Sequence, residues 1–233
     1  MKERPILFSA PMVNAILDGK KTQTRRVVTQ KMNPHDFLGG IGDNKNDPYN
    51  YGFENPDCLG HFITLPEQRC PYGKIGDQLW VRETFHRPTD QVTIYRANWR
   101  EDARARGFDN IPNTVNWKWT PSIHMPRWAS RIQLEITDIG VERLQDISEE
   151  DAKSEGIIFA GKSVNGFDMY AHHGAVHTMK ELGGSGDSKL ADVEFIGRTA
   201  KQAFMKLWQK INGAESWDKN PWVWVIEFER IKP

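Results

Sequence analysis

Lys21 and Thr24 are the residues of this chain whose types and spacing most clearly suggest chemistry. They lie in the stretch ILDGKKTQTRR, residues 16 to 26, beside three further cations, Lys20, Arg25 and Arg26. An amine serves as a base or an electrostatic clamp for a hydroxyl only within hydrogen-bond reach, and a base also needs a depressed pKa. Burial and neighbouring positive charges both lower the pKa of a lysine. The stretch therefore predicts a pocket that contains Lys21 and Thr24.

This prediction requires a turn or bulge between Gly19 and Thr24. A straight strand would place Lys21 and Thr24 on opposite faces, because side chains alternate along a strand. An irregular segment after the expected helix over residues 9 to 19 would bring both side chains to one site.

The charge balance limits what the whole molecule can attract. The 233 residues include 31 Lys plus Arg and 31 Asp plus Glu, so an anion must be attracted by a local patch. Nucleic-acid binding is neither supported nor excluded by bulk charge. The first apolar run is interrupted by Pro11 and Asn14, which suits neither a signal peptide nor a membrane span. We expect a cytoplasmic protein without a membrane partner.

The cysteines and histidines give little indication of a metal site. Cys58 and Cys70 are too few for a disulfide framework and are expected to be reduced. With His61 they offer three zinc ligands, whereas a structural site needs four in tighter pairing, so we expect no metal and no cofactor. Loop histidines at the spacing found later in the chain are typically solvated, and we interpret three in this way: His172, His173 and His177.

Periodicity predicts a small set of elements. Strands are expected at 5 to 8, 77 to 85, 92 to 96, 130 to 144 and 221 to 231, and helices at 9 to 19, 148 to 156 and 198 to 213. In the second strand, Leu79, Val81 and Glu83 should share one face. The last strand is apolar on both faces over its first half, as expected for a central or barrel strand.

Three segments interrupt these elements as insertions, at about 29 to 73, 98 to 128 and 160 to 196, and the last contains no clear element. Strands separated by long connections and a few short helices predict an α+β or closed β-barrel architecture. We see no domain boundary, so residues 1 to 233 are interpreted as a single domain with insertions.

The residues Gly19, Lys21, Thr22, Thr24 and Arg26 behind a short helix resemble the signature of the ASCH domain family. The resemblance covers residues 5 to 28, 74 to 85, 131 to 158 and 221 to 231, and it implies a PUA-like β-barrel flanked by short helices. The chain is especially similar to bacterial N4-acetylcytidine amidohydrolases. With its insertions, it looks more like the longer ASCH proteins of phages and prophages.

The resemblance implies a Lys, a Thr and a Glu as catalytic residues. Lys21 and Thr24 match the first two, and the segment AKSEG points to Glu155 as the third. Independently, Glu155 falls in the last turn of its expected helix, where a negative charge opposes the helix dipole. The candidate substrate-binding residues lie on the same elements or in the second insertion: Thr22, Arg26, Arg82, Glu83, Arg127 and Trp128.

Two of these candidates have alternative interpretations. Arg26 either holds a phosphate or carboxylate of a ligand or pairs with a carboxylate such as Glu83, and we favour the structural pair. The tryptophans of residues 98 to 128 either stack bases or anchor the insertion, and Trp128 beside Arg127 is the preferred base-stacking candidate.

The sequence therefore supports two functions. The first is an amidohydrolase that removes an acyl group from an N4-acylated cytidine-like nucleoside or base. The alternative is a PUA-like module that binds nucleic acid, RNA rather than DNA, with or without ribonuclease activity.

Overall fold

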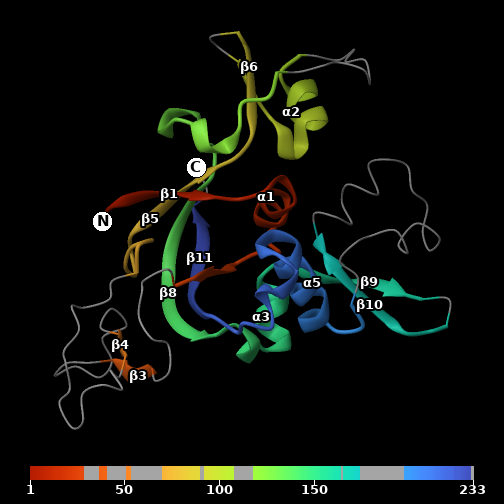
Figure 1. Cartoon of the computed structure of the whole chain (residues 1–233). Helices are drawn as coiled ribbons and strands as arrows, with labels where there is room; N and C mark the ends of the chain where they lie inside the picture. Colours follow the sequence, from red (N-terminus) through yellow and green to blue (C-terminus); the bar gives the residue numbers. More distant parts are fainter. Residues whose placement is uncertain are drawn as a thin grey trace.

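The computed structural model describes residues 1–28, 37–40, 51–53, 70–89, 92–107, 118–163, 165–173 and 197–231. Its centre is a five-stranded sheet in the order β1-β5-β8-β11-β2 (Figure 1). The strands are β1 (Glu3–Leu7), β2 (Gln23–Val27), β5 (Gln78–Arg82), β8 (Gln133–Arg143) and β11 (Trp222–Ile231). β1 and β5 are parallel, and the other neighbouring pairs are antiparallel.

The two longest strands follow the predicted patterns. On β8, Leu134 and Ile136 are buried and Glu135 is exposed, which confirms the alternation. On β11, the residues from Val223 to Ile226 are all buried, and this half pairs with β8 on one side and β2 on the other. The prediction of a central strand is confirmed.

The sheet curls so that its two edge strands approach one another. The guanidinium of Arg26 on β2 donates a hydrogen bond to the backbone oxygen of Leu7 on β1 at 2.8 Å, and it lies over the ring of Phe8. Helix α1 (Ala10–Leu17) makes the connection between these strands. The architecture is mixed α and β, and the described strand pairings include no ladder between β1 and β2.

Two further helices pack on this sheet. α3 (Glu149–Ser154) and α5 (Ala200–Asn212) contact each other, and α5 buries the apolar face predicted from its spacing, with Phe204, Leu207 and Trp208 in the core. α5 ends at Gly213, as expected. Among the described residues, no helix has the length and apolar character needed to cross a membrane.

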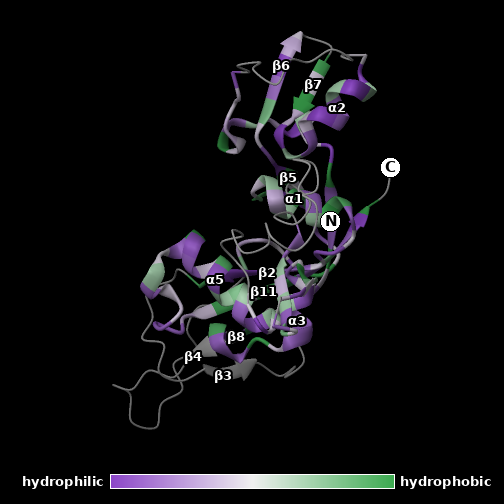
Figure 2. Ribbon diagram, turned by 90° about the vertical axis from the view of Figure 1, so that its right-hand side faces the viewer, coloured by the Kyte–Doolittle hydropathy of each residue, from purple (hydrophilic) through white to green (hydrophobic). Residues whose placement is uncertain are grey.

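A lobe formed by β6 (Phe85–Thr89), β7 (Val92–Tyr95) and α2 (Trp99–Ala105) projects at one end of the molecule (Figure 2). The strand predicted over 77 to 85 stops at Arg82, and the chain starts a new strand at Phe85. The burial of Leu79, Val81 and Glu83 on one face is confirmed.

The prediction that residues 160 to 196 contain no clear element was wrong for the residues that the structure describes there. β9 (Ile157–Lys162) and β10 (Asp168–His172) form an antiparallel hairpin. In the first insertion, β3 (Phe37–Gly40) pairs with β4 (Tyr51–Phe53). Cys58, His61 and His177 lie outside the described residues.

Candidate functional site

Lys21 lies between α1 and β2 and is almost completely buried, with 2% of its surface exposed. Its ammonium group donates to three oxygens: the backbone oxygen of Gln23 at 2.8 Å, that of Glu155 at 3.1 Å, and Oε2 of Glu155 at 2.5 Å. The predicted irregular segment is present, because Gly19 has a φ of 66° and β2 begins only at Gln23. Residues from the two halves of the chain therefore meet here.

The environment lowers the pKa of Lys21. Burial is the largest cause, the charge and hydrogen bond of Glu155 act in the opposite direction, and the cations Arg26 and Arg25 add to the lowering. This matches the electrostatic effect expected from the crowded cations. An ammonium has three N–H donors, and each of those of Lys21 has an acceptor.

Glu155 is placed by the end of α3. The helix begins with a capping box in which the Ser148 hydroxyl accepts from the amide of Asp151 and the Asp151 carboxylate accepts from the amide of Ser148. Glu155 is its C-cap, and Gly156 follows with a φ of 96° that ends the helix. The carboxylate is directed at Lys21 and is 3% exposed.

Arg25 is the main residue of the site that the sequence interpretation did not select. It is 2% exposed, its Nε donates to Glu142 at 2.7 Å, and its Nη1 contacts the second carboxylate oxygen of Glu155 at 3.4 Å. Nη1 also donates to Gln23 at 2.5 Å. Gln23, Thr24 and Arg25 are consecutive and all buried, so the strand shows no alternation that would have indicated this role.

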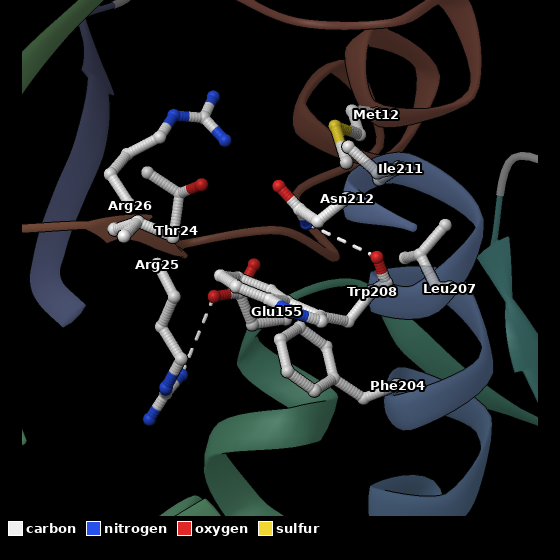
Figure 3. Close-up of a pocket in the computed structure, with 11 residues that line it drawn as sticks. Met12, Thr24, Arg25, Arg26, Glu155, Phe204, Leu207, Trp208, Ile211 and Asn212 are labelled. Atoms are coloured by element: carbon white, nitrogen blue, oxygen red, sulfur yellow. Dashed lines mark hydrogen bonds and ion pairs between the residues drawn. The ribbon is translucent and has the colours of Figure 1, made fainter. Parts of the chain in front are cut away.

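Thr24 and Glu155 line the same cavity, of about 60 Å³. β2 also contributes Arg25 and Arg26 to its wall, and Figure 3 shows Thr24 and Arg26 facing the α1 and α5 side chains across it. Lys21 does not line the cavity, and its three hydrogen bonds do not include the Thr24 hydroxyl. Glu155 thus connects the lysine to the cavity.

The opposite wall of the cavity is largely apolar and aromatic. Met12 of α1 and five residues of α5 form it: Phe204, Leu207, Trp208, Ile211 and one polar residue, Asn212. The indole Nε1 of Trp208 is buried and has no acceptor among the described residues. A buried donor without a partner costs about 1 to 3 kcal/mol, so a ligand oxygen that reached it would be favoured.

The size of the cavity sets what it can enclose. A single water needs about 10 to 15 Å³ of such space, so 60 Å³ accommodates a group of a few heavy atoms and not a whole nucleoside. An acyl or amide group fits this volume. The rest of a larger ligand would lie at the mouth, near the partly exposed Val27 and Ile211.

The favoured pairing of Arg26 with Glu83 is wrong. Arg26 binds the backbone of Leu7, whereas both carboxylate oxygens of Glu83 accept from Arg131, at 2.8 and 3.0 Å. Several carboxylates in the sequence could pair with Arg26. The curl of the sheet places Arg26 beside Leu7, and Glu83 pairs with Arg131 instead. Arg26 stays beside Thr24 in the cavity wall.

The remaining sequence candidates are distributed over other parts of the structure. Thr22 is exposed and pairs through its backbone with Ser154 and Phe228. Arg82 donates to the backbone of Ile123 and lies over Trp80. Arg127 forms an exposed ion pair with Glu3, and Trp128 is 62% exposed, with the guanidinium of Arg87 at 4.7 Å from its ring. None of these residues lines the Thr24 cavity.

The interpretation of His172 as solvated was wrong, whereas His173 is partly exposed. His172 is 1% exposed, and its pKa is lowered to about 3 by burial and by the nearby charges of Lys21 and His173. The Nε2 atom of His173 lies 2.5 Å from the carboxylate of Asp18. Spacing in an insertion carries no information about burial, because the β9–β10 hairpin that buries His172 was itself not predicted.

Within the part of the chain that the structure describes, no group of three His, Cys, Asp or Glu side chains is arranged to hold a metal ion. The chain matches no protein-family model, no curated protein and no solved structure. The geometry of the site and the resemblance of its residues are therefore the basis for assigning a function.

Proposed function

We propose that this chain is an amidohydrolase of the ASCH type that removes an acyl group from an N4-acylated cytidine-like nucleoside or base. The observation that carries the proposal is the buried contact of Lys21 with Glu155 at 2.5 Å, with Glu155 and Thr24 in the wall of one cavity. The cavity has room for the acyl group, and its mouth would hold the nucleoside.

The proposed mechanism starts at Thr24. Its hydroxyl oxygen attacks the acyl carbonyl while the Glu155 carboxylate accepts the hydroxyl proton, and the N–H groups of Arg26 stabilise the oxyanion. The protonated Glu155 then gives this proton to the leaving N4 amine, which forms an acyl-threonine and releases the free base. Water, deprotonated by Glu155, hydrolyses the acyl-threonine. Lys21 holds Glu155 in position through their ion pair.

The fold is consistent with a PUA-like barrel. β1 and β2 are the two edge strands of the sheet, and the hydrogen bond from Arg26 to the backbone oxygen of Leu7 joins them. We propose that the curved sheet is such a barrel, with the cavity beside the junction between β1 and β2.

Two conservative variants test the hydrolase directly. Thr24→Ser keeps the hydroxyl, and Thr24→Val keeps the shape of the side chain without it. Thr24 is buried on a paired strand, and neither change adds volume there, so both variants should fold. With N4-acetylcytidine as substrate and chromatography as the readout, Thr24→Ser should retain activity and Thr24→Val should lose at least about 100-fold. If the wild type leaves acetylcytidine and related acylated nucleosides intact, or Thr24→Val remains as active as the wild type, the proposal fails.

A nucleic-acid-binding module is the second candidate function, and the exposure of Trp128 favours it. The ring is accessible and has the guanidinium of Arg87 beside it, an arrangement that can stack an unpaired base. Binding of a short single-stranded RNA should weaken steeply with salt and fall several-fold in Trp128→Ala. Salt-insensitive or unchanged binding would remove this candidate.

A further inference from the structure

A second cavity lies on the face of α5 that points away from Phe204 and Trp208. Its volume is about 610 Å³, within the range of roughly 300 to 1,000 Å³ that is typical of small-molecule sites. The helix contributes Gln202 and Lys206, which are one turn apart and therefore share a face. The β9–β10 hairpin and the segment before α5 form the other walls.

Backbone contacts fix the shape of this groove. Gly197 exchanges two hydrogen bonds with Tyr170 of β10, at 2.8 and 2.9 Å. A Cβ atom at position 197 would lie 2.4 Å from the backbone nitrogen of Ala203, so only glycine allows the chain to pass this close to α5. Arg198, the next residue, is thereby held at the edge of the groove.

The groove has a cationic and aromatic lining. The guanidinium of Arg198 lies 4.6 Å from the ring centre of Phe167, which is 51% exposed. No carboxylate among the described residues pairs with Arg198, and Asp168, the acid in the lining, lies 3.6 Å from Lys162. A ligand anion would therefore meet Arg198 and Lys206 without displacing a carboxylate from Arg198.

The first turn of α5 does not supply this site. The amide of Ala200 donates to Glu149 at 2.8 Å, and that of Gln202 donates to the N-cap Thr199. Because these donors are already used, recognition in the groove depends on side chains.

We propose that this groove binds a phosphorylated ligand with a planar ring, of the mononucleotide class. The phosphate binds Arg198 and Lys206, which supply charge-assisted hydrogen bonds, and the ring packs against Phe167. Asn165 and Gln202, whose Oε1 already accepts from the backbone amide of Arg198, line the groove and leave their side-chain amide nitrogens to bind the polar edge of the ring or the sugar. A free nucleotide and the terminal nucleotide of a strand share this chemistry. The proposal does not depend on hydrolysis at Thr24.

Calorimetric titration of the full chain with cytidine 5′-monophosphate, cytidine and inorganic phosphate tests the groove. The monophosphate should bind more tightly than either fragment. Arg198→Ala and Lys206→Ala should each weaken it at least about fivefold, because each removes a charged phosphate contact. Phe167→Ala should weaken the monophosphate and leave inorganic phosphate unchanged. Lys210→Ala is the matched control, because it removes the same charge from the same helix outside the lining.

Each outcome of this titration is decisive. Absence of saturable binding of the monophosphate, or equal binding by wild type, Arg198→Ala and Lys206→Ala, overturns the proposal. Tighter binding of a 5′-phosphorylated dinucleotide than of the monophosphate assigns the groove to a strand end, and the reverse order assigns it to a free nucleotide. Thr24→Val should bind these probes like the wild type.

Discussion

Lys21 bears a large electrostatic cost, because its ammonium group is removed from water. Three oxygen acceptors and the carboxylate of Glu155 offset that cost, and Arg25 contacts the other oxygen of the same carboxylate. The burial of Lys21 and Arg25 and the burial of Glu155 thus each require the opposite charge of the other. The acid remains in one position because both of its oxygens are held.

We predict that Lys21→Met destabilises the fold by about 3 to 5 kcal/mol, since it leaves Glu155 buried with only the longer contact to Arg25. The double variant Lys21→Met, Glu155→Gln removes the unpaired charge and should recover at least half of this loss. Urea denaturation of the wild type, both single variants and the double variant measures the coupling. Equal stability of Lys21→Met and the double variant would contradict the mutual dependence.

His172 makes folding sensitive to pH. The unfolded chain binds a proton at this residue near its ordinary pKa of 6.5, whereas the folded protein does so only near its pKa of about 3. Stability from this group is therefore complete above pH 6.5 and is lost as the pH falls. At pH 5 the loss should be about 1 to 2 kcal/mol.

The comparison that isolates His172 is denaturation of wild type and His172→Gln at pH 7 and pH 5. The variant should show the smaller decrease in unfolding free energy between the two pH values. Burial raises the pKa of Glu83, so its protonation changes stability with pH in the opposite direction. This contribution is the same in both proteins and cancels when their stability changes are subtracted. An identical decrease in the two proteins would show that His172 does not titrate as described.

At the scale of elements, the joint between α3 and β9 sets the position of Glu155. A Cβ atom at Gly156 would lie 3.2 Å from the Cβ of Ala15 on α1 and 3.4 Å from that of Lys21. This close approach brings the C-terminal end of α3 against the segment that carries the lysine. The absence of a side chain at Gly156 therefore lets the end of α3 pack against α1, although the two helices are far apart in sequence.

Gly156→Ala should destabilise the protein by about 2 to 3 kcal/mol, because it adds a crowded methyl group to a strained backbone. Gly166→Ala is the matched control: its φ is also positive, at 77°, but nothing lies within 4 Å of the added atom, so about 1 kcal/mol is expected. Thermal unfolding measures both. Acetylcytidine hydrolysis should fall in Gly156→Ala only; equal effects on stability would mean that the close approach is unimportant.

The sequence predicted the elements that bury one face, because burial on one face leaves a period. β8 and α5 are examples; β11 was predicted instead from its continuous apolar run, and the two ends of α3 followed from Ser148 and Gly156. The hairpin of β9 and β10 was missed because its buried positions do not alternate regularly. Arg25 was missed for a related reason: the run Gln23, Thr24 and Arg25 is buried without alternation, and the partners of Arg25 come from β8 and α3.

At the scale of the whole molecule, the ion pair between Arg131 and the buried Glu83 connects the lobe of β6, β7 and α2 to the sheet. Glu83 follows β5, and Arg131 precedes β8 and binds it through two hydrogen bonds. The same guanidinium lies 4.0 Å from the ring centre of Tyr95 on β7 and donates to Asn98 at 2.8 Å. Glu83, a candidate for substrate binding from the sequence, therefore has a clear structural task.

We predict that Glu83→Ala destabilises the protein by about 1 to 3 kcal/mol, because Arg131 would lose its two hydrogen bonds to Glu83 and keep only Asp102, at 4.0 Å, as a carboxylate neighbour. Backbone amide hydrogen exchange should accelerate more in β6, β7 and α2, which lose their connection to the sheet, than in β8 and β11. The matched control is Arg127→Ala, which breaks a pair with Glu3 that is about 40% exposed and should therefore change the stability little. Uniform acceleration over the lobe and the sheet would contradict a separate anchoring role, because the two parts would then unfold as one unit.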